Sequence, residues 1–145
     1  MSEETAPEVT GRSERRPLTL DQIARLALPG LGVIMPRISW RYWTLYYAAK
    51  QGNWALARFE AHEIRELMGL GTLTRPKYQA HLEEFVRERL APIEKAIERR
   101  DWKAFEAAYQ EGTQAANGYH EANDKPFIVW KLPDHPPPGL DLGPL

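Results

Sequence analysis

The stretch DWKAFEAAYQEGTQAANGYH, residues 101–120, has the pattern of one long amphipathic α-helix. Apolar and small residues recur in it every three or four positions, which places their side chains on one face of a helix. Asp101 is a favourable N-cap residue, because its carboxylate can accept a hydrogen bond from a free backbone N–H of the first turn. The apolar face of this predicted helix consists of Trp102, Phe105, Ala108, Tyr109, Gly112, Ala116 and Tyr119.

Three segments upstream of this stretch show the same helical spacing. Residues 38–51 are rich in aromatic side chains and are followed by a glycine. Residues 53–68 begin with asparagine, another good N-cap, and end before Gly69. Residues 76–100 begin with a proline, which is favoured at a first helical position, and contain Pro92, which predicts a kink. Four amphipathic helices with mostly short connections predict an all-α fold, an antiparallel four-helix bundle.

An internal similarity supports the pairing of these helices. GNWALARFE at residues 52–60 and RDWKAFEAA at residues 100–108 each place Asn or Asp, and then Trp, at a helix start after a tight turn. Two stacked helical hairpins would use this arrangement twice. A tetratricopeptide array is the minor alternative, because the two copies are farther apart than its repeat of about 34 residues and no third copy follows.

The remaining segments are shorter or irregular. Residues 18–27 predict a short N-terminal helix that is ended by PGLG at residues 29–32, and the apolar VIMPRI segment at residues 33–38 is predicted to be irregular. Proline and glycine dominate the last residues. We therefore expect a disordered leader at residues 1–17, one bundle domain at residues 18–133 and an extended Pro-rich tail at residues 134–145.

Composition excludes several classes of function. The chain has 19 basic and 20 acidic residues, so no net field attracts nucleic acid or an anionic membrane. It has no cysteine, which excludes disulfides, thiolate zinc sites, cysteine nucleophiles and haem attached through thioethers. The first residues form no apolar run, so we expect a cytoplasmic protein, or a periplasmic one if the native chain carries a signal peptide. No catalytic motif is present, and we expect no enzyme.

Three polar side chains on the predicted apolar faces need a partner or a function. Glu60 falls inside the apolar stripe of its helix, where a lone carboxylate is costly to bury. Arg89 is its candidate partner, either in a structural ion pair or as a charge that lines a ligand pocket. His120 lies at the flank of the last helix, where its ring can also stabilise the final carbonyl groups. The other histidines, His62, His81 and His135, are expected on the surface.

The first long helix has a second aromatic face. Trp40, Trp43 and Tyr47 point to a different side of the helix from Tyr42 and Leu45. Either the apolar segments VIMP and PFIVW cover this face, or a second subunit does. The second case predicts a homodimer with Trp40, Trp43 and Tyr47 at the interface.

Three segments together resemble a known family. PGLGVIM at residues 29–35, WRYWTLYYAAKQGNWALARFEAHEI at residues 40–64 and QAANGYHEANDKPFIVWKLP at residues 114–133 are similar, in the same order, to small bacterial c-type cytochrome-like proteins with a cytochrome c′-like helical bundle. In that family the last segment carries Cys-x-x-Cys-His, whose cysteines hold haem and whose histidine is an axial iron ligand. Glu60 also matches a glutamate of the family.

The resemblance implies a cofactor site without its attachment chemistry. Ala116 and Tyr119 stand at the two cysteine positions, whereas Asn117 and His120 match the family. Tyr42 also stands where the family tends to have histidine, and Val33 where it has glutamate. The resemblance thus implies a haem-less relative in which the Tyr119 ring fills the vacated space, or a protein that still holds haem non-covalently through His120.

We therefore expect a non-enzymatic bundle that binds a small apolar or aromatic ligand or a protein partner, without a cofactor. The alternative is a non-covalent haem protein, for electron transfer or gas sensing, with His120 as the axial ligand. A structural or regulatory interaction module is the second alternative. The residues expected to line the pocket are Tyr42, Tyr46, Glu60, Arg89, Tyr109, Tyr119 and His120.

Overall fold

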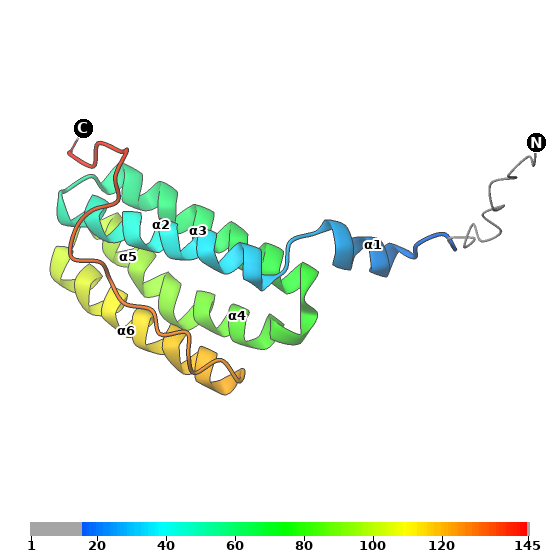
Figure 1. Ribbon diagram of the computed structural model, residues 1–145. Helices are drawn as coiled ribbons and strands as arrows, with labels where there is room; N and C mark the ends of the chain where they lie inside the picture. The colour runs from blue at the N-terminus through cyan, green and yellow to red at the C-terminus, as the bar shows by residue number, and fades with distance from the viewer. Residues whose placement is uncertain (1–15, 145) are drawn as a thin grey trace, which may run out of the picture.

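The computed structural model describes residues 16–144 and is all-α, with no strand in that range. Its long helices pack side by side as a helical bundle, with α4 and α5 joined through a π-helical turn into one rod (Figure 1). The all-α prediction is confirmed. Most of the predicted leader, residues 1–15, lies outside the described residues. The α-helices are α1 (Leu20–Ala27), α2 (Leu31–Lys50), α3 (Trp54–Thr74), α4 (Gln79–Phe85), α5 (Ala91–Arg99) and α6 (Trp102–Ala122).

The two helical hairpins, α2–α3 and α5–α6, are closed by the same turn. Asn53 and Asp101 are the N-caps, and each side chain accepts a hydrogen bond of 3.1 Å from a backbone N–H three residues later. The backbone N–H of each cap donates to the carbonyl five residues back, at 2.8 Å for Asn53 and 3.0 Å for Asp101. The preceding residues, Gly52 and Arg100, have positive φ angles of 80° and 53°. This geometry confirms both predicted helix starts.

The prediction that residues 33–38 are irregular is wrong, because α2 begins at Leu31 and runs through Pro36. Ile34 and Ile38, one helical turn apart, are both buried in the core. Their burial requires helical spacing from the start of the segment. Pro36 lies early in the helix, on the exposed side, and it removes only the hydrogen bond to the Gly32 carbonyl.

Helix α3 also extends beyond its predicted end at Gly69 and finishes at Thr74. Gly71 explains this, because a Cβ atom there would lie 3.1 Å from the Leu82 side chain and 3.2 Å from that of Leu31. Gly71 therefore serves close packing of α3 against α2 and α4, whereas nothing lies within 4 Å of an added Cβ atom at Gly69, and neither glycine ends the helix.

Near Pro92, where the sequence predicts a kink, the structure has a π-helical turn at Val86–Leu90, two residues before the proline. The N–H of Ala91 donates to the carbonyl of Val86, five residues back. Proline lacks an N–H and its ring crowds the carbonyl four residues earlier, so a wider turn before Pro92 accommodates it.

Two tyrosines join α2 to α6 in the centre of the bundle. The Tyr42 and Tyr109 rings stack with centroids 4.0 Å apart and an interplanar angle of 10°. Each hydroxyl donates to the other residue's backbone carbonyl, at 2.7 Å from Tyr42 and 2.8 Å from Tyr109. Burial raises the pKa of both hydroxyls well above its ordinary value. The paired rings therefore remain neutral hydrogen-bond donors that fix the two helices together.

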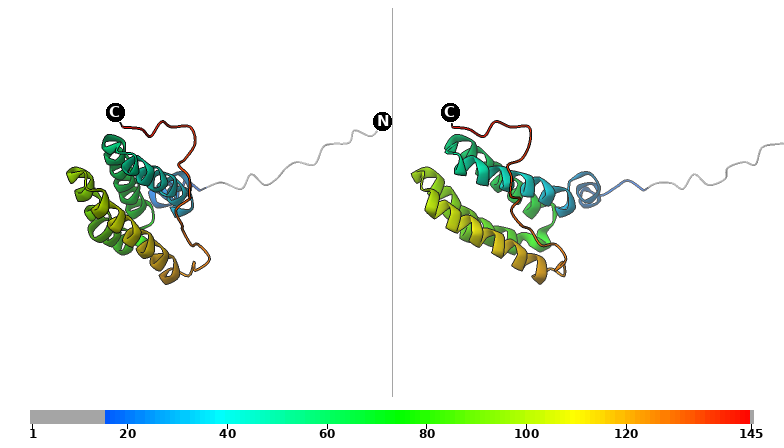
Figure 2. Two further views of the ribbon diagram at one scale, coloured as in Figure 1. Left: turned by 90° about the vertical axis from the view of Figure 1, so that its left-hand side faces the viewer. Right: turned by 60° about the vertical axis from the view of Figure 1, so that its left-hand side comes forward.

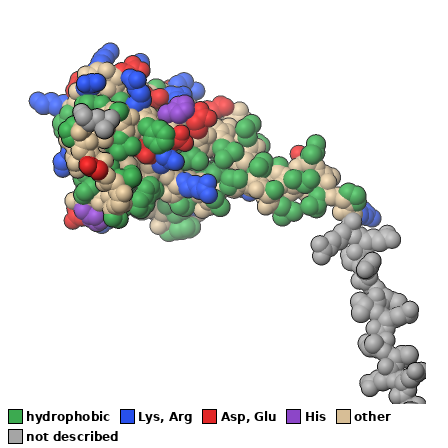
Figure 3. Space-filling view, turned by 90° about the horizontal axis from the view of Figure 1, so that it is seen from above, with side chains coloured by type: hydrophobic (Ala, Val, Ile, Leu, Met, Phe, Trp, Pro, Cys, Tyr) green, Lys and Arg blue, Asp and Glu red, His purple; other side chains and the backbone are tan. Residues whose placement is uncertain are grey.

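The chain after α6 returns along the bundle as an extended segment (Figures 1 and 2). At the opposite end of the molecule α1 projects away from the bundle and buries none of its side chains. Its hydrophobic side chains, with Leu20 85% exposed, are visible from above in Figure 3. No helix among residues 16–144 combines the length and the apolar character needed to cross a lipid bilayer.

Candidate functional site

A cavity of about 500 Å³ opens in the bundle between α2, α4 and α6. The returning segment closes one side of it with Ile128, Val129 and Trp130. Its volume lies within the range of sites that hold small organic ligands, about 300–1,000 Å³. Most of its wall is apolar, and the apolar lining includes Met35, Ile38, Met68, Leu82 and Phe85.

His120, at the end of α6, lies in the wall of this cavity. Its Nδ1 atom is 2.9 Å from the carbonyl oxygen of Ile128, which can only accept a hydrogen bond. In the neutral ring the proton is therefore on Nδ1 and the lone pair is on Nε2. A backbone carbonyl that orients an imidazole in this way is the arrangement found behind metal-binding histidines.

His81, on α4, lines the same cavity and has the opposite tautomer. Its Nδ1 atom is 3.0 Å from the side-chain nitrogen of Asn123. That nitrogen also donates to the carbonyl of Tyr119 at 2.7 Å, which identifies it as the amide NH₂ group. His81 Nδ1 is therefore an acceptor, and Nε2 carries the proton of the neutral ring. The expectation that His81 is a solvated surface residue is wrong, because α4 packs across the end of α6.

Tyr119 lies beside His81, with the ring centroids 4.9 Å apart. Its hydroxyl donates a short hydrogen bond to the carboxylate of Glu84. Burial and this bond to Glu84 raise the pKa of Tyr119 to about 12. The bond ties the hydroxyl to Glu84 on α4, so the ring lines the cavity and does not fill it.

An amide clamp holds the returning segment over the cavity. The Asn117 side chain donates to the carbonyl of Trp130 at 3.1 Å and accepts from the Trp130 N–H at 2.7 Å. The Trp130 indole N–H donates to the hydroxyl of Ser39 on α2. Trp130 is thereby packed between α2 and α6, whereas Phe127, Ile128 and Val129 of the same segment remain exposed.

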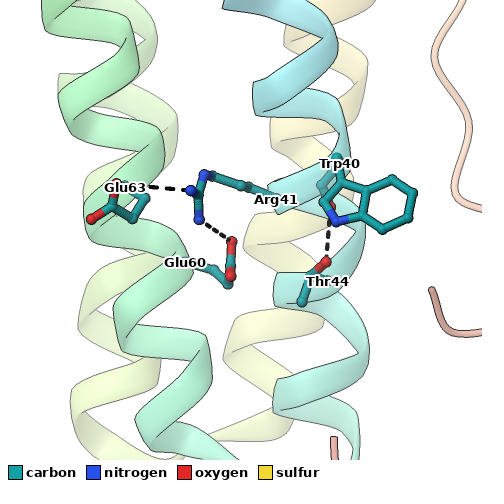
Figure 4. A network of polar contacts seen from close by, with 5 residues as sticks. All are labelled: Trp40, Arg41, Thr44, Glu60 and Glu63. Atoms are coloured by element: carbon teal, nitrogen blue, oxygen red, sulfur yellow. Dashed lines mark hydrogen bonds and ion pairs between the residues drawn. The ribbon is translucent and has the colours of Figure 1, made fainter. Parts of the chain in front are cut away.

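The predicted partnership of Glu60 with Arg89 is wrong. Glu60, on α3, is buried and pairs with Arg41 of α2 at 3.2 Å, and Arg41 also lies 4.0 Å from Glu63 (Figure 4). Burial raises the pKa of Glu60 and the Arg41 charge partly opposes this effect. Arg89 instead lies 3.7 Å from Glu111 of α6. Arg89 lies in the π-helical turn, which the spacing of the sequence did not indicate and which changes the register of its side chains from that of an α-helix.

The structure brings three of the seven predicted pocket residues together at the cavity: Tyr42, Tyr119 and His120. Tyr46 and Tyr109 belong to the neighbouring aromatic cluster, where their ring centroids are 5.0 Å apart. Glu60 and Arg89 lie outside the cavity wall. The sequence reasoning missed several lining residues, namely His81, Asn123, Lys125, Met35 and Ile38. For His81 a signal existed, because Tyr78, His81 and Phe85 follow one another at helical spacing.

The second aromatic face of α2 is covered by the chain's own tail. The Trp43 indole N–H donates to the carbonyl of His135 at 2.8 Å, and the Tyr47 hydroxyl donates to the carbonyl of Pro133 at 2.6 Å. Trp40 remains 48% exposed and packs edge-on against Trp43. Of the two explanations that the sequence allowed for this face, cover by the chain itself accounts for Trp43 and Tyr47, but these contacts come from Pro133 and His135. The segments expected to provide the cover do not make these hydrogen bonds, and VIMP is part of α2 itself.

The remaining histidines follow the expectation of surface positions. His62 on α3 and His135 in the tail are both exposed. Within residues 16–144 no group of three or more His, Asp or Glu side chains is arranged to hold a metal ion.

Comparison with known proteins gives no assignment: the chain matches no protein-family model, no curated protein and no solved structure.

Proposed function

We propose that this protein is a non-enzymatic binding protein that takes a small apolar or aromatic molecule into the cavity between α2, α4 and α6. The observation that carries the proposal is the cavity itself, about 500 Å³ in volume with a mostly apolar wall. Transfer of an apolar molecule from water into such a space is favourable, at about 25 cal/mol per Å² of buried apolar surface.

The polar groups around the cavity fit binding better than catalysis. The Tyr42 and Tyr119 hydroxyls are engaged by a backbone carbonyl and by Glu84, and each histidine has one nitrogen fixed by a neighbour. A few fixed polar groups in an apolar wall orient a ligand. In this proposal the fold is an antiparallel four-helix bundle of the cytochrome c′ type, in a cytoplasmic protein.

The proposal is tested by titration with N-phenyl-1-naphthylamine, a neutral molecule that fluoresces in apolar surroundings. We expect saturable binding at one equivalent. Ala116→Leu, which fills part of the cavity, should weaken binding about tenfold or more, whereas Ala107→Leu, the same change on the exposed side of α6, should leave it unchanged. No saturable binding, or equal binding by both variants, refutes the proposal.

Non-covalent haem is the second candidate ligand, and one observation favours it. The hydrogen bond from His120 Nδ1 to the Ile128 carbonyl leaves the lone pair on Nε2, as an axial iron ligand requires. His120 and the apolar wall thus fit this group, which would supply redox or gas-binding chemistry when bound. The chain has no cysteine for covalent attachment, so affinity would depend on this ligand and on the apolar contacts.

A haemin titration followed by visible absorption tests this second candidate. His120→Ala should abolish a sharpened Soret band that the wild type develops at one equivalent, and His62→Ala, an exposed histidine on α3, should retain it. A wild-type spectrum equal to that of free haemin excludes the haem ligand and leaves the apolar-ligand proposal standing.

A protein partner is the weaker form of the proposal. The aromatic face that would receive it is reduced to Trp40, since the tail holds Trp43 and Tyr47. A dimer that buries Trp40 would favour this form.

A further inference from the structure

The charged and polar groups at the cavity are unevenly distributed. The residues that line the cavity all belong to the described part of the chain. Among them Lys125 alone has a side chain that is always charged at neutral pH, and none is Asp or Glu. A wall with a cation and no anion selects against cationic ligands and favours anionic ones.

The end of α6 fixes the position of Lys125. Asp124 has a left-handed backbone with φ 61°, and the Lys125 N–H donates to the carbonyl of His120 at 2.7 Å. The Lys125 ammonium lies 3.3 Å from the carbonyl of Asn123 and 5.7 Å from the centroid of the Tyr78 ring. No ion pair joins it to a carboxylate within residues 16–144, so its charge is available to a ligand.

A second cation and a hydrogen-bond donor lie on the same side. The Lys77 ammonium is 4.8 Å from the centroid of the Tyr78 ring, which both lysines therefore approach. The His81 ring, held by Asn123, carries its proton on Nε2 in the neutral form and can donate it to an anion. Lys125 and His81 both line the cavity and both contact Asn123, so each is a candidate donor to an acidic group bound there.

The rest of the wall suits an alkyl chain. Met35, Met68 and Leu82 are flexible apolar side chains, and Ile38 and Phe85 complete a surface without charge. Methionine adapts its shape to irregular apolar ligands. This part of the cavity can bury an aliphatic body while the polar end receives its head.

We propose that the cavity binds a fatty acid, with the carboxylate at Lys125 and His81 and the alkyl chain along the methionine-lined wall. The inference rests on the proposed function, because it names the class of apolar ligand that the same cavity takes.

The test is displacement of N-phenyl-1-naphthylamine by dodecanoate and by dodecanol, both below the concentrations at which they aggregate. A charge-assisted hydrogen bond contributes about tenfold in affinity, so dodecanoate should bind about ten times more tightly than dodecanol. Lys125→Gln should remove this preference, Lys125→Arg should keep it, and Lys103→Gln, which changes the net charge equally at an exposed position on α6, should also keep it.

The outcomes separate the two proposals. Equal affinity for acid and alcohol, or an unchanged preference in Lys125→Gln, overturns the fatty-acid inference and leaves the binding of apolar molecules intact. If neither dodecanoate nor dodecanol displaces the bound probe, the proposal that the cavity takes an alkyl chain is overturned. Failure of the probe itself to bind refutes the underlying function.

Discussion

Gly112 on α6 faces the hydroxyl of Tyr42, and this contact gives a substitution whose effect should change sign. A Cβ atom at position 112 would lie 2.5 Å from the Tyr42 hydroxyl oxygen, which is too short for a non-bonded contact. The next nearest atoms would be the ζ carbon of Tyr42 at 3.6 Å and a methyl group of Ile93 at 3.7 Å, both ordinary contacts. The conflict therefore concerns one oxygen atom.

The magnitudes follow from opposing contributions to the free energy of unfolding. Overpacking in a core costs about 1–3 kcal/mol, and alanine in place of glycine inside a helix contributes about 1 kcal/mol. Gly112→Ala should therefore destabilise the wild type by about 1 kcal/mol. In the Tyr42→Phe background, which itself loses a hydrogen bond of about 1 kcal/mol, the same change should stabilise the protein by up to about 1 kcal/mol.

The assay is urea unfolding of the four proteins of this cycle at constant pH and temperature. We expect a coupling energy of about 2 kcal/mol between positions 42 and 112, obtained as the difference between the two Gly112→Ala effects. Gly118→Ala is the matched control, because nothing lies within 4 Å of an added Cβ atom there. The reasoning is refuted if Gly112→Ala has the same effect in both backgrounds.

Three further predictions concern other parts of the bundle. Burial raises the pKa of Glu60, so the wild type should lose stability relative to Glu60→Gln as the pH rises above 4.5. Urea unfolding of both proteins at several pH values measures the difference between their free energies of unfolding, and a difference that does not change with pH contradicts the prediction. Asn117→Ala removes two hydrogen bonds to the Trp130 backbone, of about 1 kcal/mol each, so hydrogen exchange at the Trp130 amide should accelerate; unchanged protection there argues against the clamp. Asp101→Ala removes the N-cap of α6 and should lower the free energy of unfolding by about 1 kcal/mol in a urea titration, and a variant as stable as the wild type contradicts this role.

The features that could be predicted from the sequence are those that depend on local chemistry. Asn53 and Asp101 indicated two helix starts because capping depends on a few adjacent residues. The helix boundaries that were predicted incorrectly, near Pro36 and Gly69, depend on tertiary packing. Burial of Ile34 outweighs the missing hydrogen bond at Pro36, and Gly71 allows α3 to continue against Leu82.

The difference between local chemistry and tertiary packing also explains which residues of the candidate site could be predicted. His120 and Tyr119 stood out because their segment resembled a cofactor-binding motif, whereas His81 and Lys125 reach the cavity only through the packing of α4 and the turn after α6. The partner of Glu60 was predicted incorrectly because Arg89 lies in a π-helical turn, which the spacing of the sequence does not predict, and pairs with Glu111. A carboxylate in an apolar stripe predicted that a partner exists, and packing decided that it is Arg41.

The most direct test of the central claim, that the cavity is a binding site, uses the methionine methyl groups. The chain has three methionines, and two of them, Met35 and Met68, line the cavity. In protein labelled with ¹³C at the methionine methyl groups, titration with N-phenyl-1-naphthylamine should shift the Met35 and Met68 signals together, with saturation at one equivalent. Signals of Met35 and Met68 that stay unchanged at saturating concentrations of the compound would contradict the account.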